Sequence, residues 1–317
     1  MRTQVNVLRP GELGPGHLSA WRGIQESQAC LNSPFFSPEF VFAVAAERDD
    51  VFVAVLERDN DIDGFFAFHR DAEGVGIPVG VRISDYQGLV ARDCDHLCAP
   101  DLLRACGLRR WDFRCVPASQ KPFQLYQART LRTLAIDLAG GFEAYAAWLK
   151  ESGSHLLTRL RKMQRQVEES EGPTHFIWHA ADIESLRRLL ECKSGQYRRT
   201  GYADLFAQLW IVRTLQRLHA AQDVACRGVL SELRAGDRLL AAHFGIRSRT
   251  VLHYWFPCYE ASFARHSPGL LLLLEIVKQT GSEGISRIDL GFANAPYKAR
   301  FANANDAVAR GSITAAV

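Results

Sequence analysis

The stretch that decides the fold is LHYWFPCYEASFARHSPG (252–269), followed by LLLLLEIVKQT (270–280) and GSEGISRIDLGF (281–292). Its pattern predicts a strand, a tight polar loop, a helix and a second strand that ends at Asp289-Leu290-Gly291. We expect any ligand of this protein to bind in this stretch.

The start of the predicted helix has the features of an anion site. Proline suits the first helical position, and the serine before it can accept a bond from the first-turn amides. The following glycine lets a ligand approach the backbone, and the helix dipole favours a phosphate or pyrophosphate there. An ordinary capped helix without a ligand is the alternative. The residues predicted to form this ligand site are Arg265, His266, Ser267, Pro268, Gly269 and Leu270.

Composition places the chain among ordinary globular proteins. It has 317 residues, 47% hydrophobic and 23% charged, which is enough for two domains. A net charge of +3 is too small to indicate nucleic-acid binding. The N-terminal MRTQVNVLRPGELG lacks the apolar core of a signal peptide, and the longest apolar run, Leu270 to Leu274, is far too short to span a membrane. These features predict a cytoplasmic protein with no transmembrane segment.

The eight cysteines do not form a pattern typical of a metal site or a disulfide framework. No C-x2-C pair occurs, so we predict reduced, buried thiols and no bound metal. The segment Asp93-Cys94-Asp95-His96 is the one local cluster that merits a metal-binding assay.

The order of predicted elements indicates two domains, at 1–139 and 140–317. The first contains helices, a hairpin near residues 51–70, a helix near 100–106 and a strand near 111–116. The second contains a helical segment interrupted near Gly153, a strand, a helix capped by Asp182 and a further helix. Three antiparallel strands follow, with a hairpin at Ala235-Gly236-Asp237 between the first two, and then the helix described above, a further strand and a final strand at 312–316. We therefore predict an α/β (α+β) protein with two mixed, mostly antiparallel sheets flanked by helices.

The second half resembles the core of a GNAT acyltransferase in the order of its elements. The chain as a whole resembles the CelD/BcsL-like GNAT acetyltransferases linked with cellulose and other exopolysaccharide synthesis. The segments that carry this resemblance, in family order, are PFFSPEF (34–40), SDYQGLV (84–90), GDRLLAAHFG (236–245), HYWFPCYEASFARHSPGLLLL (253–273) and IDLGFANAPYKARF (288–301).

This resemblance implies two fused GNAT-like domains, the first degenerate and the second carrying the donor loop. It also implies an acyl-CoA donor, acetyl-CoA or another, and an amine or hydroxyl acceptor on a sugar nucleotide, a polysaccharide precursor or a related metabolite. Tyr297 lies where such enzymes often carry the tyrosine that protonates the departing sulfur. Lys298 resembles the lysine of the family's YK motif. A packed tyrosine and a solvated lysine are the alternatives.

Four further residues are candidates for acid–base work in the second half. His243 and His253 lie on neighbouring predicted strands, and Glu232 lies on the strand before them, so each is a candidate general base. Asp289, at the end of a strand, is a candidate to orient Lys298 or the acceptor. Buried structural histidines and a turn-capping aspartate are the alternatives.

Two further groups are predicted to contact the acceptor or the coenzyme. Asp85, Tyr86 and Gln87 combine an acid, an aromatic ring and an amide beside a glycine, as in many sugar sites. Arg159, Lys162 and Arg165 are spaced to share one helix face, which suits an anionic acceptor or the coenzyme's 3′-phosphate. A plain turn and a solvated charged face are the respective alternatives.

Three functions stay open at this stage. Direct attack on acyl-CoA is favoured, because no Ser-His-Asp or Cys-His-Asp set has an interpretable spacing. Aminoacyl transfer from charged tRNA, as in Fem-type enzymes, is one rival. A catalytically inactive GNAT-like binding module is the other, because the loop has one fewer glycine than the family's pyrophosphate-binding loop.

Overall fold

A computed structural model describes residues 3–292 and 295–315. The chain divides into two compact units: Met1–Thr133 with Asp306–Val317, here unit 1, and Leu134–Asn305, here unit 2. Two long strands, β7 (Gln127–Asp137) and β13 (Ala304–Thr314), each pass from one unit into the other. The last part of the chain therefore returns to unit 1, whereas the sequence placed it in the second domain.

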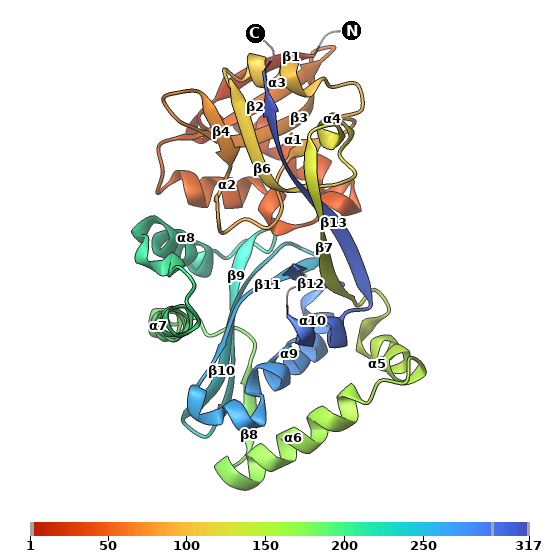
Figure 1. Cartoon of the computed structure of the whole chain (residues 1–317), viewed down its shortest axis with the longest axis vertical. Helices are drawn as coiled ribbons and strands as arrows, with labels where there is room; N and C mark the ends of the chain where they lie inside the picture. Colours follow the sequence, from red (N-terminus) through yellow and green to blue (C-terminus); the bar gives the residue numbers. More distant parts are fainter. Residues whose placement is uncertain (1–2, 293–294, 316–317) are drawn as a thin grey trace. The chain divides into compact units, whose positions relative to one another are not determined.

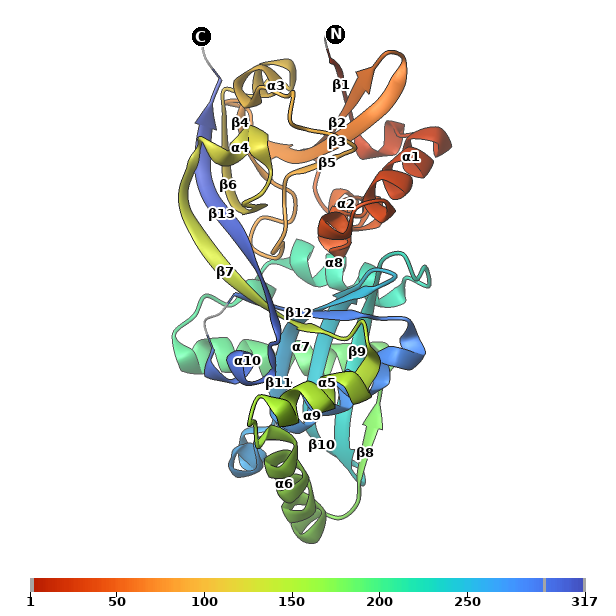
Figure 2. The ribbon, with the colours of Figure 1, turned by 90° about the vertical axis from the view of Figure 1, so that its right-hand side faces the viewer.

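Unit 1 contains a sheet in the order β1-β2-β3-β4-β6-β13, with β5 paired to β3. Figure 2 shows α1 and α2 on one face of β2 and β3. The strands are β1 (Gln4–Leu8), β2 (Val51–Arg58), β3 (Asp61–Arg70), β4 (Val75–Pro78), β5 (Leu89–Ala91) and β6 (Arg110–Pro117). The helices are α1 (Pro15–Glu26), α2 (Pro38–Ala45), α3 (Ala99–Ala105) and α4 (Lys121–Gln124).

Aromatic side chains fill both faces of the unit 1 sheet. Trp21 of α1 stacks on Phe65 of β3 with ring centres 4.5 Å apart, and on the other face Phe66 meets Trp111 edge-on at 4.9 Å. Ser37 caps α2 by accepting from the Phe40 amide, as its sequence predicts. Such buried aromatic pairs stabilise the fold by more than their buried apolar area alone would.

Unit 2 contains a sheet in the order β7-β12-β11-β10-β9-β8. In Figure 1, α7 and α8 lie on one side of β9–β11, and α9 and α6 lie on the other. The strands are β8 (Thr174–Ile177), β9 (Arg227–Ala235), β10 (Arg238–Arg247), β11 (Val251–Tyr259) and β12 (Arg287–Phe292). The helices are α5 (Gly141–Glu151), α6 (Leu156–Glu171), α7 (Ile183–Thr200), α8 (Leu209–Ala220), α9 (Pro268–Gln279) and α10 (Pro296–Phe301).

Local signals placed most elements of unit 2 correctly. Asp182 caps α7 by accepting from the Ser185 amide. Gly153, with a positive φ of 73°, lies in the turn between α5 and α6. Gly236, with a φ of 54°, lies in the turn of the β9–β10 hairpin. The helix break, the cap and the hairpin predicted from the sequence are therefore confirmed.

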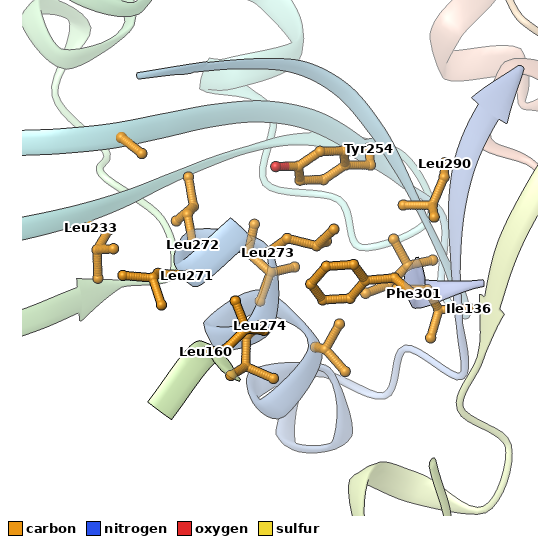
Figure 3. Close-up of a cluster of buried hydrophobic side chains, with 14 of the residues drawn as sticks. Ile136, Leu160, Leu233, Tyr254, Leu271, Leu272, Leu273, Leu274, Leu290 and Phe301 are labelled. Carbon is orange, nitrogen blue, oxygen red and sulfur yellow. The ribbon is translucent and has the colours of Figure 1, made fainter. Parts of the chain in front are cut away.

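The core of unit 2 is built around the leucine run of α9. Figure 3 shows Leu271 to Leu274 surrounded by side chains from β9, β11, β12, α6 and α10. Because four consecutive leucines are buried, α9 is apolar on more than one face and is held firmly. This packing fixes the N-terminus of α9 relative to β11 and β12.

The sequence failed to predict β7 and most of β13. The first half of β7 carries exposed polar residues, so its apolar signal is short. The tail was predicted to hold a strand only at 312–316, whereas β13 already begins at Ala304. Both strands are set by long-range pairing, such as Val308 with Pro117, that local pattern does not encode.

Candidate active site

The strands β11 and β12 run in parallel and then part. Their paired residues are Val251 with Arg287, Leu252 with Ile288, and His253 with Asp289. Beyond this pairing β11 continues to Tyr259 and β12 to Phe292. We call this divergence the β11–β12 fork. Pro257 lies past the fork, where its missing N–H removes no bond between these two strands.

A short 3-10 helix, Ala261–His266, joins the end of β11 to the N-terminus of α9. Ser267 was predicted to cap this helix, and this is wrong: its side chain makes no cap bond, and its backbone is left-handed, with φ 47° and ψ 51°. A non-glycine residue in this region is strained, and such strain is frequent at ligand sites. The first-turn amides therefore have no side-chain cap, which suits an anion.

The other predicted donor residues surround this helix start. A methyl group on Gly269 would meet only Tyr259, at 3.8 Å, so space remains beside the backbone. The Arg265 Nε donates to the His266 Nε2 at 2.8 Å, and the Arg265 side chain is 70% exposed. Pro268 is buried, and Leu270 packs partly against the core. Arg265, whose Nη2 lies 3.9 Å from the Glu171 Oε1, thus supplies an exposed cation close in sequence to the uncapped amides.

His253 and Asp289 form the last pair before the strands diverge. Their side chains are 1% and 5% exposed, and the His253 Nδ1 lies 3.6 Å from the Asp289 Oδ1. That carboxylate oxygen also accepts from the Gly291 amide at 2.7 Å. A carboxylate next to an imidazole occurs behind many catalytic histidines, although these two atoms lie just beyond hydrogen-bond distance.

His243 lies on β10 and is entirely buried. Its Nε2 accepts from the Trp255 amide at 3.3 Å, so the ring is neutral and its proton is on Nδ1. The ring stacks on Tyr254 at 4.2 Å, and Gly245 leaves the room that it needs. Burial holds the pKa of His243 well below its usual value. These contacts engage the nitrogen that a general base would need, and they hold the irregular β10–β11 register.

Tyr297 and Lys298 lie on α10, just after β12. Burial raises the pKa of Tyr297 to about 12, so its hydroxyl stays protonated at neutral pH. The Lys298 Nζ donates to the Phe292 carbonyl at 2.9 Å, at the end of β12. Tyr297 also packs partly against the core around α9. A phenol donor and an ammonium therefore both belong to the β12 side of the fork.

Lys193 on α7 is a fork residue that the sequence did not reveal. Its Nζ donates to the Pro257 carbonyl at 2.9 Å and to the Gln196 side chain at 3.1 Å. Burial lowers the pKa of Lys193, and the charge of Lys298 adds to this effect. Lysines thus bind a carbonyl on each strand beyond the fork. Lys193 sits in an amphipathic helix rich in charges, so no sequence signal distinguishes it.

Glu232 has a partner that limits it as a base. It is 2% exposed, and its Oε2 lies 2.8 Å from the Arg234 Nη1. Breaking this ion pair would leave an uncompensated charge in the interior. The geometry therefore favours a structural role for Glu232 over that of a general base.

In unit 1, the loop with Asp85, Tyr86 and Gln87 is largely buried. The Tyr86 hydroxyl lies 3.2 Å from the Thr133 hydroxyl. The Gln87 side chain accepts from the Arg114 and Cys115 amides at 3.3 Å and donates to the Ser84 carbonyl. Tyr86 and Gln87 therefore hold this loop within unit 1. Asp85 is only partly buried.

Arg159, Lys162 and Arg165 all lie on α6 and are exposed. Arg159 also lines a cleft of about 350 Å³ formed within unit 2 by α5, α6 and α10. The structure thus places Arg159 in a concave site and the other two on the open surface of the helix.

The predicted thiol chemistry needs one correction. All eight cysteines are free, but Cys30 and Cys98 are exposed and Cys94 and Cys192 are only half-buried, so four of the eight are buried as predicted. Within residues 3–292 and 295–315, no three His, Cys, Asp or Glu side chains gather as metal ligands would. In the same residues, every helix falls short of a bilayer span in length or in apolar content.

Residues 154–299 match a family model described as an acetyltransferase (GNAT) domain. The protein is an acyltransferase with a GNAT fold. The match covers most of unit 2 and includes the fork and α9. Comparison with curated protein sequences finds no match.

Solved structures share the fold over nearly the whole chain. FemX aligns with 98% of this chain and 97% of its own, with a TM-score of 0.61 and 9% identity. The C-terminal domain (DUF2156) of a putative lysylphosphatidylglycerol synthetase from Agrobacterium fabrum aligns over 95% and 92%, with a TM-score of 0.58 and 13% identity. A tandem GNAT protein from the clavulanic acid biosynthesis pathway aligns over 100% and 99%, with a TM-score of 0.54 and 9% identity. The tandem GNAT-like fold predicted from the sequence is therefore confirmed.

Proposed function

We propose that unit 2 transfers an acyl group from an acyl-CoA to an amine or hydroxyl group by direct attack. The acceptor class that the CelD/BcsL-like resemblance supports is a sugar nucleotide, a polysaccharide precursor or a related metabolite. The single observation that carries the proposal is the β11–β12 fork, joined by one short 3-10 helix to an uncapped helix N-terminus. A fork can hold the thin pantetheine arm, and the helix start can hold its pyrophosphate.

The residues of the fork support a division of labour. The acceptor's nucleophile attacks the thioester carbon, and His253 takes its proton, with Asp289 stabilising the imidazolium. As the new C–N or C–O bond forms, the C–S bond breaks. Tyr297 then donates its hydroxyl proton to the departing sulfur, for which a protonated phenol is required.

The positive groups beside the fork suit the donor's charge. Arg265 stands exposed next to the first turn of α9, where it would meet a pyrophosphate. Lys298 and Lys193 hold the strand ends by binding the carbonyls of Phe292 and Pro257. We assign these two lysines to positioning the fork.

A thermal-shift screen followed by a turnover assay tests the proposal. Acetyl-CoA or a longer acyl-CoA should raise the melting temperature, and thiol release should follow with a panel of amine and hydroxyl acceptors. No shift with any coenzyme A species would contradict an acyl-CoA donor. A shift without thiol release on any acceptor would favour an inactive binding module.

Aminoacyl transfer is the second candidate. It is favoured by the likeness in fold to FemX over both chains. In that case the melting temperature should not respond to acyl-CoA, and a charged tRNA should serve as donor. The same screen thus separates the two donors.

A further inference from the structure

A concave site in unit 2 lies away from the predicted donor residues. It is the cleft of about 350 Å³ between α5, α6 and α10, and Trp148, Ser152, Ser154, His155, Arg159 and Arg300 are among its lining residues. It shares no lining residue with the start of α9 or with the fork pair His253 and Asp289. We call it the α5–α6–α10 cleft.

The cleft carries uncompensated positive charge. Within residues 3–292 and 295–315, the side chains of Arg159 and Arg300 form no ion pair or hydrogen bond, and no acidic residue lines the cleft. Elsewhere in unit 2, exposed arginines such as Arg187 pair with glutamates. Two unpaired guanidinium groups from different helices suit a phosphate in charge and in hydrogen-bond donors.

Trp148 supplies an apolar platform beside these charges. Its side chain is 38% exposed, and its ring stacks against Tyr145 with centres 6.1 Å apart. Tyr145 is itself buried and donates from its hydroxyl to the Phe301 carbonyl at 2.7 Å. The platform is thus fixed to both α5 and α10, and an exposed indole face suits stacking on a sugar ring or a base.

The turn between α5 and α6 adds polar groups and a favourable field. Gly153, with a φ of 73°, makes this turn possible. Ser154 accepts from the Leu156 amide at 3.3 Å, which leaves its hydroxyl proton available to a ligand. The cleft also contains the N-terminal end of the 16-residue α6, whose dipole favours an anion.

We propose that this cleft binds a phosphate ester carried on a ring, as in a nucleotide or a sugar phosphate, and that this ligand is distinct from the acyl donor. The phosphate lies between Arg159 and Arg300, and the ring stacks on Trp148. The proposal concerns binding alone and stands whether or not acyl transfer is demonstrated.

Titration calorimetry on the full chain tests the site with uridine diphosphate, glucose 1-phosphate, uridine and glucose. The two phosphorylated compounds should bind and the two uncharged ones should not. Arg159→Gln or Arg300→Gln should each weaken binding about tenfold, as expected for a lost charge-assisted bond. Trp148→Ala should weaken it as well. Arg161→Gln, which removes an exposed charge from the same helix outside the cleft, is the matched control and should change affinity less than about twofold.

Three results would overturn the assignment. The first is no binding of either phosphorylated compound at millimolar concentration. The second is equal weakening by Arg161→Gln and Arg159→Gln, which would indicate a nonspecific charge effect. The third is displacement of uridine diphosphate by acetyl-CoA, which would give the cleft to the donor; unchanged affinity in saturating acetyl-CoA is the expected result.

Discussion

In unit 1, β4 and β6 pair in parallel at two positions, Val75 with Arg110 and Gly76 with Trp111. In unit 2, β11 and β12 pair in parallel at three positions, ending at His253 and Asp289. Each unit thus has strands that part after a short parallel contact. The difference lies in what occupies the edge beyond that contact.

In unit 1 the chain itself fills the edge. The backbone amide of Gln87 donates to the Cys115 carbonyl at 3.0 Å, and the Gln87 side-chain oxygen accepts from the backbone amides of Arg114 and Cys115. In unit 2 the groups at the corresponding edges are the carbonyls of Pro257 and Phe292, each bound by a lysine. A folded loop of unit 1 therefore occupies the kind of edge at which we propose that unit 2 binds the donor. The difference predicts that only the unit 2 fork binds coenzyme A.

The largest expected effect comes from the acid–base pair of the unit 2 fork. His253→Gln should lower kcat about 100-fold or more, because it removes the proposed proton acceptor. His243→Gln is the matched control: its amide oxygen can still accept from the Trp255 amide, so kcat should stay within about tenfold of the parent. Steady-state thiol release measures both. Equal losses in the two variants, with both folded by circular dichroism, would refute the distinction.

Tyr297→Phe should have the next largest effect. Loss of the phenol proton should lower kcat about 10- to 100-fold with little change in KM for the donor, because the hydroxyl acts on the leaving sulfur. Tyr202→Phe, at a tyrosine with 71% exposure, is the control and should leave kcat unchanged. A variant whose KM alone rises would assign Tyr297 to binding instead.

The loop that closes the unit 1 edge should matter for stability and not for chemistry. Gln87→Ala removes three side-chain hydrogen bonds and should lower the free energy of unfolding by about 2 kcal/mol, measured in urea. Transfer rates should be unaffected. Gln124→Ala, at an exposed glutamine of the same unit, should cost less than about 0.5 kcal/mol. A loss of turnover in folded Gln87→Ala would assign this loop to the active site.

Acid should loosen unit 2 before unit 1. Burial lowers the pKa of His179 to about 4 and holds that of His243 well below its usual value, so between pH 6.5 and 4 the unfolded chain binds protons that folded unit 2 does not. Stability therefore falls as pH falls through this window, by about 1–2 kcal/mol for the half-buried His179 after allowance for solvent screening.

The Asp50 carboxylate of unit 1 responds at lower pH. Burial opposes ionisation of Asp50, but hydrogen bonds from His69 and Arg48 hold its pKa well below the usual value, so its contribution is lost only below about pH 4. Hydrogen exchange at pH 7 and 4.5 should show unit 2 peptides losing protection first. His179→Asn keeps an acceptor for the Leu230 amide and should reduce the effect. Earlier loss in unit 1 would contradict this assignment.

The elements that the sequence predicts correctly are those set by residues close together in the chain. The Asp182 cap, the Gly236 hairpin and the leucine run of α9 depend on neighbouring residues, and all were predicted correctly. Ser267 was not, because a serine before Pro-Gly usually caps, and its left-handed backbone depends on how β11 joins α9. The Gln87 side chain is bound by the amides of Arg114 and Cys115 on β6, which lie 27 and 28 residues later in the chain. No local sequence pattern encodes this contact.

Calorimetric titration with acetyl-CoA tests the central claim most directly, since only the unit 2 fork should bind the donor. The account predicts one site per chain, lost in Gly269→Trp and retained in Gly269→Ala, whose added methyl group would meet only Tyr259 at 3.8 Å. Two sites per chain, or normal binding by folded Gly269→Trp, would contradict it.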